Sequence, residues 1–323
     1  MTDFVNVENL TKKYGDLIAV DNLSFTVKEG EIFGFLGPNG AGKSTTLNVI
    51  STLIGYDSGN ITVCGYDMAK DERKIKALIG LVPQDVAVYE NMSAYENVAF
   101  FASLYGLSGT ALKAAANEAL EFVGLSEHRK LRTSKMSGGM KRRLNIACGI
   151  AHKPKLIVMD EPTVGVDAQS REHIMSSIRT LRSGGATIIY TSHYMPEVQE
   201  ICDRIAIIDK GRLAAIGTKE ELLEIITDVK TIYITCEFPP DQKESTELSV
   251  DRVLDDLKAV PDVRYVSFDP DESRFKIDVT LGSDAVTPLL RIFMDAGARI
   301  HEVQNEEPNL ETTFLALTGR ELR

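Results

Sequence analysis

The sequence predicts a two-domain α/β protein, in which a larger domain with a mixed sheet precedes a small α+β domain. Continuous apolar runs at 32–36, 156–162 and 186–193 indicate strands buried on both faces, as in a parallel sheet. Residues 93–134 are rich in Ala, Leu and Glu and are helical in pattern. The pattern of elements changes after about Thr227. A length of 323 residues agrees with this division, because one domain averages roughly 150 residues.

The larger domain, residues 1–226, starts with short elements separated by turn residues. Residues 4–33 alternate apolar and polar side chains, which predicts short antiparallel strands leading into the buried strand Ile32–Leu36. A loop, Gly37–Gly42, and a helix from about Lys43 follow. The remaining predicted elements are a strand with turns at 59–68, an apolar run at 78–84 that Pro83 stops, and a hairpin at 204–217 with its turn at Lys210 and Gly211.

The smaller domain, residues 227–323, is predicted to contain strands and helices in the order β-α-β-β-α-β. This order is that of a split βαβ, ferredoxin-like unit. The predicted elements are a strand at 231–238, a helix at 249–260, a hairpin at 263–281 with its turn at Asp269–Ser273, a helix at 285–300, a strand at 300–307 and a closing helix at 309–322. In the closing helix, Leu310, Phe314 and Leu317 are spaced as one apolar face.

The formal net charge of −11 is concentrated in the smaller domain. From Asp228 onward there are 20 acidic and 11 basic side chains, a net of −9, so the first 227 residues carry only −2. Tight non-specific binding to nucleic acid needs a basic surface. We therefore expect no nucleic-acid partner.

The cysteines and the apolar runs indicate a cytoplasmic protein. Four cysteines are scattered without a Cys-x-x-Cys pair, which favours buried thiols in a reducing compartment: Cys64, Cys148, Cys202 and Cys236. The first residues have neither the basic nor the apolar region of a signal peptide. No run approaches the ~20 apolar residues of a membrane helix.

The loop after the first buried strand is a candidate phosphate site. Gly37-x-x-x-x-Gly42-Lys43-Ser44 fits the P-loop pattern completely. The glycines let successive N–H groups face a polyphosphate, Lys43 reaches the β- and γ-phosphates, and Ser44 supplies a hydroxyl to Mg²⁺. The positive N-terminal end of the following helix adds to this attraction.

A second candidate element is "LIVMDE", residues 156–161. Its apolar residues lead to Asp160 at a strand end, where a carboxylate can hold Mg²⁺ through water. The neighbouring carboxylate, Glu161, can orient and polarise a water that attacks a γ-phosphate. The two elements together predict a nucleotide-hydrolysing site.

A third stretch of the sequence resembles the signature of one family. "MSGGMKRR", residues 136–143, precedes "MDEP", residues 159–162, and resembles the Leu-Ser-Gly-Gly-Gln signature of ATP-binding-cassette (ABC) ATPases. Other marks similar to those of the family occur in the family's order: an aromatic residue before the P-loop, a glutamine after a strand, a D-loop aspartate and a switch histidine, namely Tyr14, Gln84, Asp167 and His193. The resemblance covers about residues 3–225.

The resemblance implies MgATP as substrate and a role for each matching residue. It implies that Glu161 is the general base, with His193 and Gln84 as its catalytic partners. It implies Mg²⁺ contacts from Ser44, Gln84 and Asp160. It implies nucleotide contacts from Tyr14, Gly37, Pro38, Asn39, Gly40, Ala41, Gly42, Lys43, Ser44, Thr45, Ser137, Gly138, Gly139 and Asp167. In this family the signature binds the γ-phosphate held by a second copy, which implies a head-to-tail homodimer bridged by ATP.

The chain departs from the family pattern at the signature. Met140 replaces the last signature residue, Gln, so any contact from that amide is lost, whereas phosphate binding through Ser137 and backbone amides is expected to survive. Met136 replaces the first residue, Leu, and "VGVD" replaces the commoner D-loop. The run Lys141–Arg143 is predicted to be a solvated helix face with at most one contact to a neighbour.

Three functions are compatible with an ABC ATPase domain, because fold alone does not decide function. The chain is the ATPase of an exporter with a separate permease, or an importer ATPase with a substrate-sensing C-terminal domain, or a soluble non-transport ABC ATPase. The last is disfavoured, since those members carry two cassettes or a long coiled coil. Residues 306–322 resemble the tail of daunorubicin-resistance export ATPases, which favours the exporter. We then expect a position on the inner face of the cell membrane and a small molecule bound by the permease.

Overall fold

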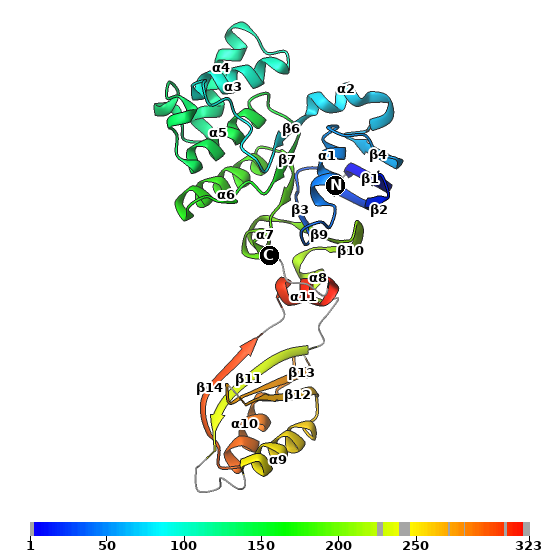
Figure 1. Ribbon diagram of the computed structural model, residues 1–323, viewed down its shortest axis with the longest axis vertical. Coiled ribbons are helices and arrows are strands. Elements are labelled where there is room, and N and C mark those ends of the chain that lie inside the picture. The colour runs from blue at the N-terminus through cyan, green and yellow to red at the C-terminus, as the bar shows by residue number, and fades with distance from the viewer. Residues whose placement is uncertain are drawn as a thin grey trace. The chain divides into compact units, whose positions relative to one another are not determined.

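A computed structural model describes residues 3–224, 229–238, 246–270, 272–280, 282–306 and 309–318 (Figure 1). The chain splits into two compact units. We call Met1–Lys219 with Leu317–Arg323 the N-terminal unit, and Glu220–Ala316 the C-terminal unit. The boundary predicted between residues 226 and 227 lies outside the described residues.

The N-terminal unit contains an antiparallel sheet of strand order β2-β1-β4-β5. Its strands are β1 (Asp3–Tyr14), β2 (Leu17–Lys28), β4 (Ser58–Val63) and β5 (Tyr66–Asp67). The first two strands are 12 residues each rather than short. Register shifts interrupt their pairing, and such irregularities break the apolar alternation from which strand length is predicted.

The second sheet of this unit has the order β10-β9-β3-β8-β7-β6. Its strands are β3 (Ile32–Leu36), β6 (Ile79–Val82), β7 (Leu156–Asp160), β8 (Thr187–Thr191), β9 (Arg204–Asp209) and β10 (Arg212–Gly217). All neighbours pair in parallel except β9 and β10, which form the predicted hairpin. Every residue of β3 and of β8 is buried, which confirms the prediction from their continuous apolar runs.

Helices surround the parallel sheet (Figure 1). They are α1 (Lys43–Ile50), α2 (Met68–Leu78), α3 (Ala94–Leu104), α4 (Gly109–Phe122), α5 (Gly138–Ile150), α6 (Ala168–Ser183) and α7 (Met195–Ile201), with 3₁₀ turns at Ser126–His128 and Thr133–Lys135. The predicted helical segment 93–134 is thus two α-helices and two turns. The first of these helices starts at a capping box formed by Ser93 and Glu96.

Aromatic packing joins the two sheets of the N-terminal unit. The ring centroid of Phe25 in β2 lies 5.6 Å from that of Phe33 and 5.2 Å from that of Phe35, both in β3. All three side chains are buried in one core. Burying a phenylalanine contributes about 1.5–3 kcal/mol, so this cluster fixes β3, and with it the loop that follows β3.

The C-terminal unit has an antiparallel sheet of order β12-β13-β11-β14. Its elements are β11 (Val229–Glu237), α9 (Thr246–Lys258), β12 (Val263–Asp269), β13 (Arg274–Thr280), α10 (Val286–Asp295) and β14 (Arg299–Glu306). Most of α8 (Lys219–Glu224) lies at the start of the unit and most of α11 (Leu310–Thr318) at its end. The observed order β-α-β-β-α-β is the predicted one; assignment to the ferredoxin-like fold stays a prediction.

Candidate functional site

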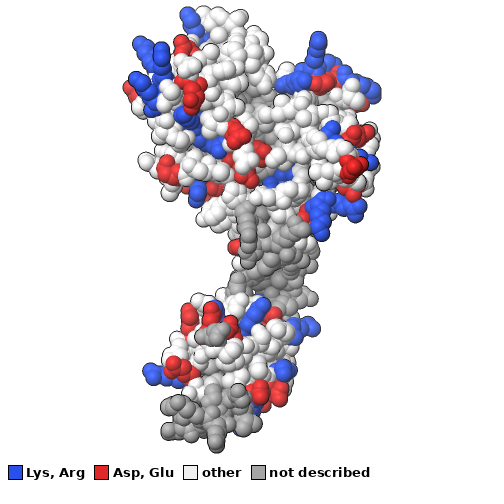
Figure 2. Space-filling model, viewed as in Figure 1, with Lys and Arg blue, Asp and Glu red and all other residues white. Residues whose placement is uncertain are grey.

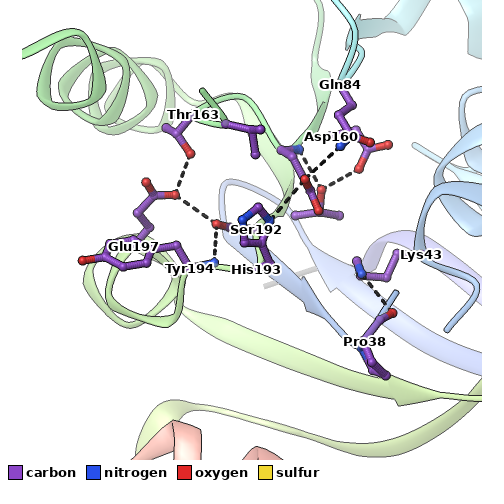
Figure 3. Close-up of polar contacts among 12 residues, drawn as sticks. Pro38, Lys43, Gln84, Asp160, Thr163, Ser192, His193, Tyr194 and Glu197 are labelled. Atoms are coloured by element: carbon purple, nitrogen blue, oxygen red, sulfur yellow. Dashed lines mark hydrogen bonds and ion pairs between the residues drawn. The ribbon is translucent and has the colours of Figure 1, made fainter. Parts of the chain in front are cut away.

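The phosphate loop and the predicted catalytic and metal-binding residues follow four neighbouring parallel strands. The loop Gly37–Gly42 follows β3, His193 follows β8, Asp160 and Glu161 end β7, and Gln84 follows β6. Because the strands are parallel and adjacent, their carboxyl ends meet at one edge of the sheet, which is the usual position of ligand sites in open α/β sheets. Figure 3 shows Lys43, Gln84, Asp160 and His193 around that edge.

One cavity of about 500 Å³ at this edge contains many of the predicted nucleotide contacts. The predicted residues that line it are Tyr14, Asn39, Gly40, Ala41, Gly42, Lys43, Ser44, Thr45, Gln84 and Glu161. The lining also includes Leu17, Ile18, Ala19 and Lys210, which were not predicted. Tyr14 is the last residue of β1 and is 49% exposed, so its ring is available to a planar ligand.

Backbone geometry requires the glycines of the loop. Gly40 and Gly42 have φ values of 80° and 99°, which L-residues with a side chain adopt at a cost. A Cβ at Gly42 would lie 2.4 Å from the carbonyl oxygen of Ala19, and one at Gly37 would lie 2.5 Å from that of Ile208. Helix α1 then begins at Lys43 without a side-chain cap, so its N-terminal end can attract an anion.

Lys43 is buried in this loop and bonded to it. Its Nζ donates to the carbonyl oxygens of Gly37 at 2.6 Å and Pro38 at 3.2 Å. Burial lowers the pKa of Lys43, and the negative charges of Glu161 and Asp160 oppose that shift. The ammonium group is therefore held between the loop and the two carboxylates.

Glu161 contacts both of the other predicted catalytic residues. One oxygen, Oε2, accepts a hydrogen bond from Gln84 Nε2 at 3.0 Å and lies 3.2 Å from His193 Nδ1. Its backbone has a φ of 46°, and its N–H donates to Thr191 Oγ1 at 2.9 Å. A non-glycine residue in this region costs about 1–3 kcal/mol, and the surrounding bonds compensate for that strain. The three predicted catalytic residues are thus in contact.

The residues predicted to hold Mg²⁺ fit that ion by their chemistry. Ser44 and Gln84 line the cavity, and Asp160 Oδ1 accepts from Thr191 Oγ1 at 2.7 Å beside it. Hydroxyl, amide and carboxylate oxygens are the hard ligands that Mg²⁺ takes together with phosphate oxygens.

The signature residues and Asp167 do not line this cavity. Ser137 caps α5 by accepting from Met140 N at 3.3 Å, and Asp167 caps α6 by accepting from Ser170 N at 2.8 Å. A Cβ at Gly139 would lie 2.2 Å from Ser170 Oγ, so the two helix starts lie against each other. We call this second cluster, Ser137–Gly139 with Asp167, the signature patch.

The predicted solvated face at Lys141–Arg143 is wrong. Arg142 is 6% exposed, and its guanidinium donates to the carbonyl oxygens of Pro83, Gln84 and Val164. Lys141 pairs with Glu90, and Arg143 donates to Val123 O at 3.0 Å. Three adjacent charged residues are typical of a solvent-exposed helix face, but here each side chain contacts a residue of another segment. Arg142 thereby connects the segment of Gln84 to the segment before Asp167.

Lys210 is the main cavity residue that the sequence analysis missed. Its hairpin turn was predicted, but the contact that brings the turn to the phosphate loop is long-range: Gly211 N donates to Ala41 O at 2.9 Å. Leu17 and Ile18 were missed because their exposure, 66% and 44%, is not evident from an alternating strand.

Comparisons with known proteins show which proteins this chain resembles. A family model described as ABC transporter matches residues 20–164. The linearmycin resistance ATP-binding protein LnrL of Bacillus subtilis is 44% identical over 99% of both chains. The daunorubicin resistance ATP-binding protein DrrA2 of Streptomyces coeruleorubidus is 35% identical, over 98% of this chain and 95% of the relative. The Nod factor export ATP-binding protein I of Rhizobium etli is also 35% identical, over 98% of this chain and 94% of the relative.

Among solved structures, one similar to this chain is the dimeric post-hydrolysis state of an ATP-binding cassette bound to ADP and phosphate. It matches with a TM-score of 0.61 and 27% identity, over 66% of this chain and 98% of that one. That match is the length of one cassette.

Proposed function

The chain belongs to the ABC transporter family, and from that premise we propose that it powers the export of a small molecule through a separate membrane permease. It is an ATP-binding and ATP-hydrolysing subunit. The observation that carries the catalytic proposal is the placement of Gln84 and His193 on one oxygen of Glu161. Glu161 and Gln84 line the cavity that Lys43 also lines. Drug-resistance and Nod-factor-export relatives support outward transport.

Glu161 acts as the general base in this proposal. Its carboxylate accepts a proton from the water that attacks the γ-phosphate, while Gln84 and His193 hold the carboxylate and the water in line. Lys43 exchanges its loop carbonyl partners for phosphate oxygens and, with the amides at the start of α1, stabilises the charge of the transferring group. Ser44, Gln84 and Asp160 would hold Mg²⁺, which would supply further positive charge to the phosphates.

Two copies complete each site in this proposal. The signature patch lies outside the cavity of its own chain, although it presents helix starts suited to an anion. A head-to-tail pair would bring the patch of one copy to the γ-phosphate bound by the other. The dimeric ABC cassette with ADP and phosphate supports this arrangement.

The permease is proposed to contact a groove beside the helical subdomain. This groove has a volume of about 590 Å³ and is lined in part by Leu53, Leu104 and Tyr105, which are 59%, 65% and 40% exposed. Its lining also includes Pro83 and Ala87, on either side of Gln84. A partner element in the groove would therefore press on the segment that carries Gln84. No described helix of this chain is long and apolar enough to span a bilayer.

Purification of the tagged chain from detergent-solubilised native membranes tests the proposal. We expect a stoichiometric multi-spanning chain that stimulates ATP hydrolysis, and we expect Leu104→Asp to reduce its recovery. Met294→Asp is the matched control, because Met294 is 70% exposed in the C-terminal unit. A permease that also requires a solute-binding protein would identify an importer. Ribosomes or DNA factors in place of a membrane chain would contradict transport.

A further inference from the structure

A buried carboxylate behind the catalytic edge has no part in the mechanism given so far. Glu197, in α7, is 3% exposed and is not among the residues that line the nucleotide cavity. Its Oε2 accepts from three hydroxyl groups: Tyr190 at 2.6 Å, Thr163 at 2.7 Å and Ser192 at 3.0 Å. Figure 3 shows this carboxylate between the segment of Thr163 and that of Ser192.

The partners of Glu197 lie next to the proposed catalytic residues. Thr163 is two residues after Glu161, and Ser192 immediately precedes His193. The hydroxyl of Ser192 also accepts from Tyr194 N at 3.0 Å. The backbone on both sides of His193 is thus fixed, through one hydroxyl, to the carboxylate of Glu197.

The other oxygen of Glu197 connects to the segment after the signature patch. Oε1 lies 3.2 Å from Arg171 Nε, in the first turn of α6, and that helix is capped by Asp167. The guanidinium of Arg171 also lies 5.0 Å from the ring centroid of Tyr194. A displacement of α6 would therefore change the contacts of both neighbours of His193, which are Ser192 and Tyr194.

Chemistry explains why a carboxylate suits this position. A buried charge is costly unless donors surround it, and charge-assisted hydrogen bonds are shorter and about twice as strong as neutral ones. Burial and the charge of Glu197 raise the pKa of Tyr190 well above its usual value, which keeps its hydroxyl protonated and able to donate. One carboxylate oxygen can accept from three hydroxyl groups and so hold the segment of Thr163 to that of Tyr190 and Ser192, whereas an amide oxygen would hold them more weakly.

We propose that Glu197 is a positioning residue that holds His193 against the Glu161 carboxylate and links this pair to the segment capped by Asp167. The proposal rests on the proposed role of His193 in ATP hydrolysis. It predicts that Glu197 affects the rate of hydrolysis without affecting the binding of ATP.

The first test measures kcat and KM for MgATP in the full-length chain. Glu197→Gln should lower kcat about tenfold or more, since small misplacements of catalytic groups are this costly, with KM changed less than about twofold. Glu200→Gln is the matched control, because Glu200 is on the same helix and 53% exposed, paired with Arg179. A normal kcat in Glu197→Gln, or equal losses of kcat and ATP affinity, would overturn the proposal.

The second test separates positioning from loss of stability. In a His193→Ala background, Glu197→Gln should lower kcat by less than about twofold further, because residues that act as a unit are not additive. A full additional loss would mean that Glu197 acts independently of His193. If His193→Ala itself hydrolyses ATP normally, the role of His193 in the proposed mechanism fails instead.

A milder variant covers the case in which Glu197→Gln does not fold. Ser192→Ala removes only the hydroxyl that joins Glu197 to Tyr194 N. It should keep ATP binding, measured with a fluorescent ATP analogue, and lower kcat in the wild-type background but not in His193→Ala. An unchanged kcat in Ser192→Ala would contradict the proposal.

Discussion

Charged side chains are buried in the N-terminal unit, whereas the buried side chains described in the C-terminal unit are apolar, with Thr313 as the exception. The buried charges are Glu31, Lys43, Arg142, Glu161 and Glu197. Exposed charges of both signs are present on both units, as Figure 2 shows for one face. Among the described residues, the two units therefore differ in whether charged side chains are buried.

The difference follows from the cost of removing a charge from water. That cost is several kcal/mol for each ion unless partners replace the solvent, so buried charges persist where they have a function. Four of the five lie in the cavity or on the segments that position it. In the C-terminal unit, β13 alternates half-buried and buried residues, with Phe275, Ile277 and Val279 inside. That alternation forms an apolar core. Any function of the C-terminal unit then depends on its surface residues.

The largest expected effect comes from neutralising one buried charge. Glu161→Gln should lose at least ~10²-fold of ATP hydrolysis, the lower range for removing a general base, and should keep ATP binding. Steady-state phosphate release and ATP affinity measure the two properties, with Glu200→Gln as control. Near-normal turnover in Glu161→Gln would remove this residue from the role.

Lys43→Ala should instead weaken the binding of nucleotide. Loss of a charged hydrogen-bond donor costs about 1.5–3 kcal/mol, which corresponds to roughly 10- to 100-fold in ATP affinity. Titration of a fluorescent ATP analogue checks this, with Lys70→Ala as the control because the Lys70 side chain is 80% exposed. Unchanged affinity would count against the phosphate-loop assignment.

A Val→Ala substitution at a buried and at an exposed position of the C-terminal sheet tests the comparison between the two units. Val279 is fully buried and Val303 is 41% exposed. Val279→Ala should lower the unfolding free energy of this unit by about 2 kcal/mol, since each buried methylene contributes about 0.8 kcal/mol and the cavity adds to the loss. Val303→Ala should cost much less in denaturant unfolding, and both should keep normal ATP affinity. A large loss of ATP affinity in either would show that the units do not divide their roles.

The smallest expected effect is a dependence of stability on pH. His152 stacks on Tyr105 with ring centroids 3.5 Å apart, and burial lowers the pKa of His152. The unfolded chain then binds a proton before the folded chain does, so this contribution to stability is present above pH ~6.5 and is lost as pH falls from there toward the folded pKa. His152→Gln should show a smaller drop in Tm between pH 7 and 5 than wild type, whereas His128→Gln, at an exposed position, should match wild type.

The elements that were predicted correctly are those whose signals come from residues close together in the sequence. The loop from Gly37 to Ser44 depends on glycine conformation and on a neighbouring strand, so its pattern is visible in eight residues. The hairpin turn at Lys210 and Gly211 and the apolar strands β3 and β8 were likewise predicted correctly, because apolar runs and turn residues are local signals.

The residues that were missed act through long-range contacts. Arg142 looked like part of a wet charged face, but its partners are about 58 and 22 residues away, at Gln84 and Val164. Glu197 was not singled out from the sequence, and its partner Thr163 is 34 residues away. Helical periodicity reports which face is apolar and gives no sign of a buried charge that is fully bonded.

The most direct test of the central claim, that the cavity and the signature patch form one site from two copies, is the molar mass of Glu161→Gln by light scattering with and without ATP. We predict 35.6 kDa without ATP and about twice that with ATP. Adding Gly138→Glu should abolish the ATP-bound dimer, because a side chain there meets no neighbouring atom within 4 Å but places a negative charge on the patch. A monomer in Glu161→Gln at saturating ATP, or a dimer that Gly138→Glu leaves intact, would contradict the claim.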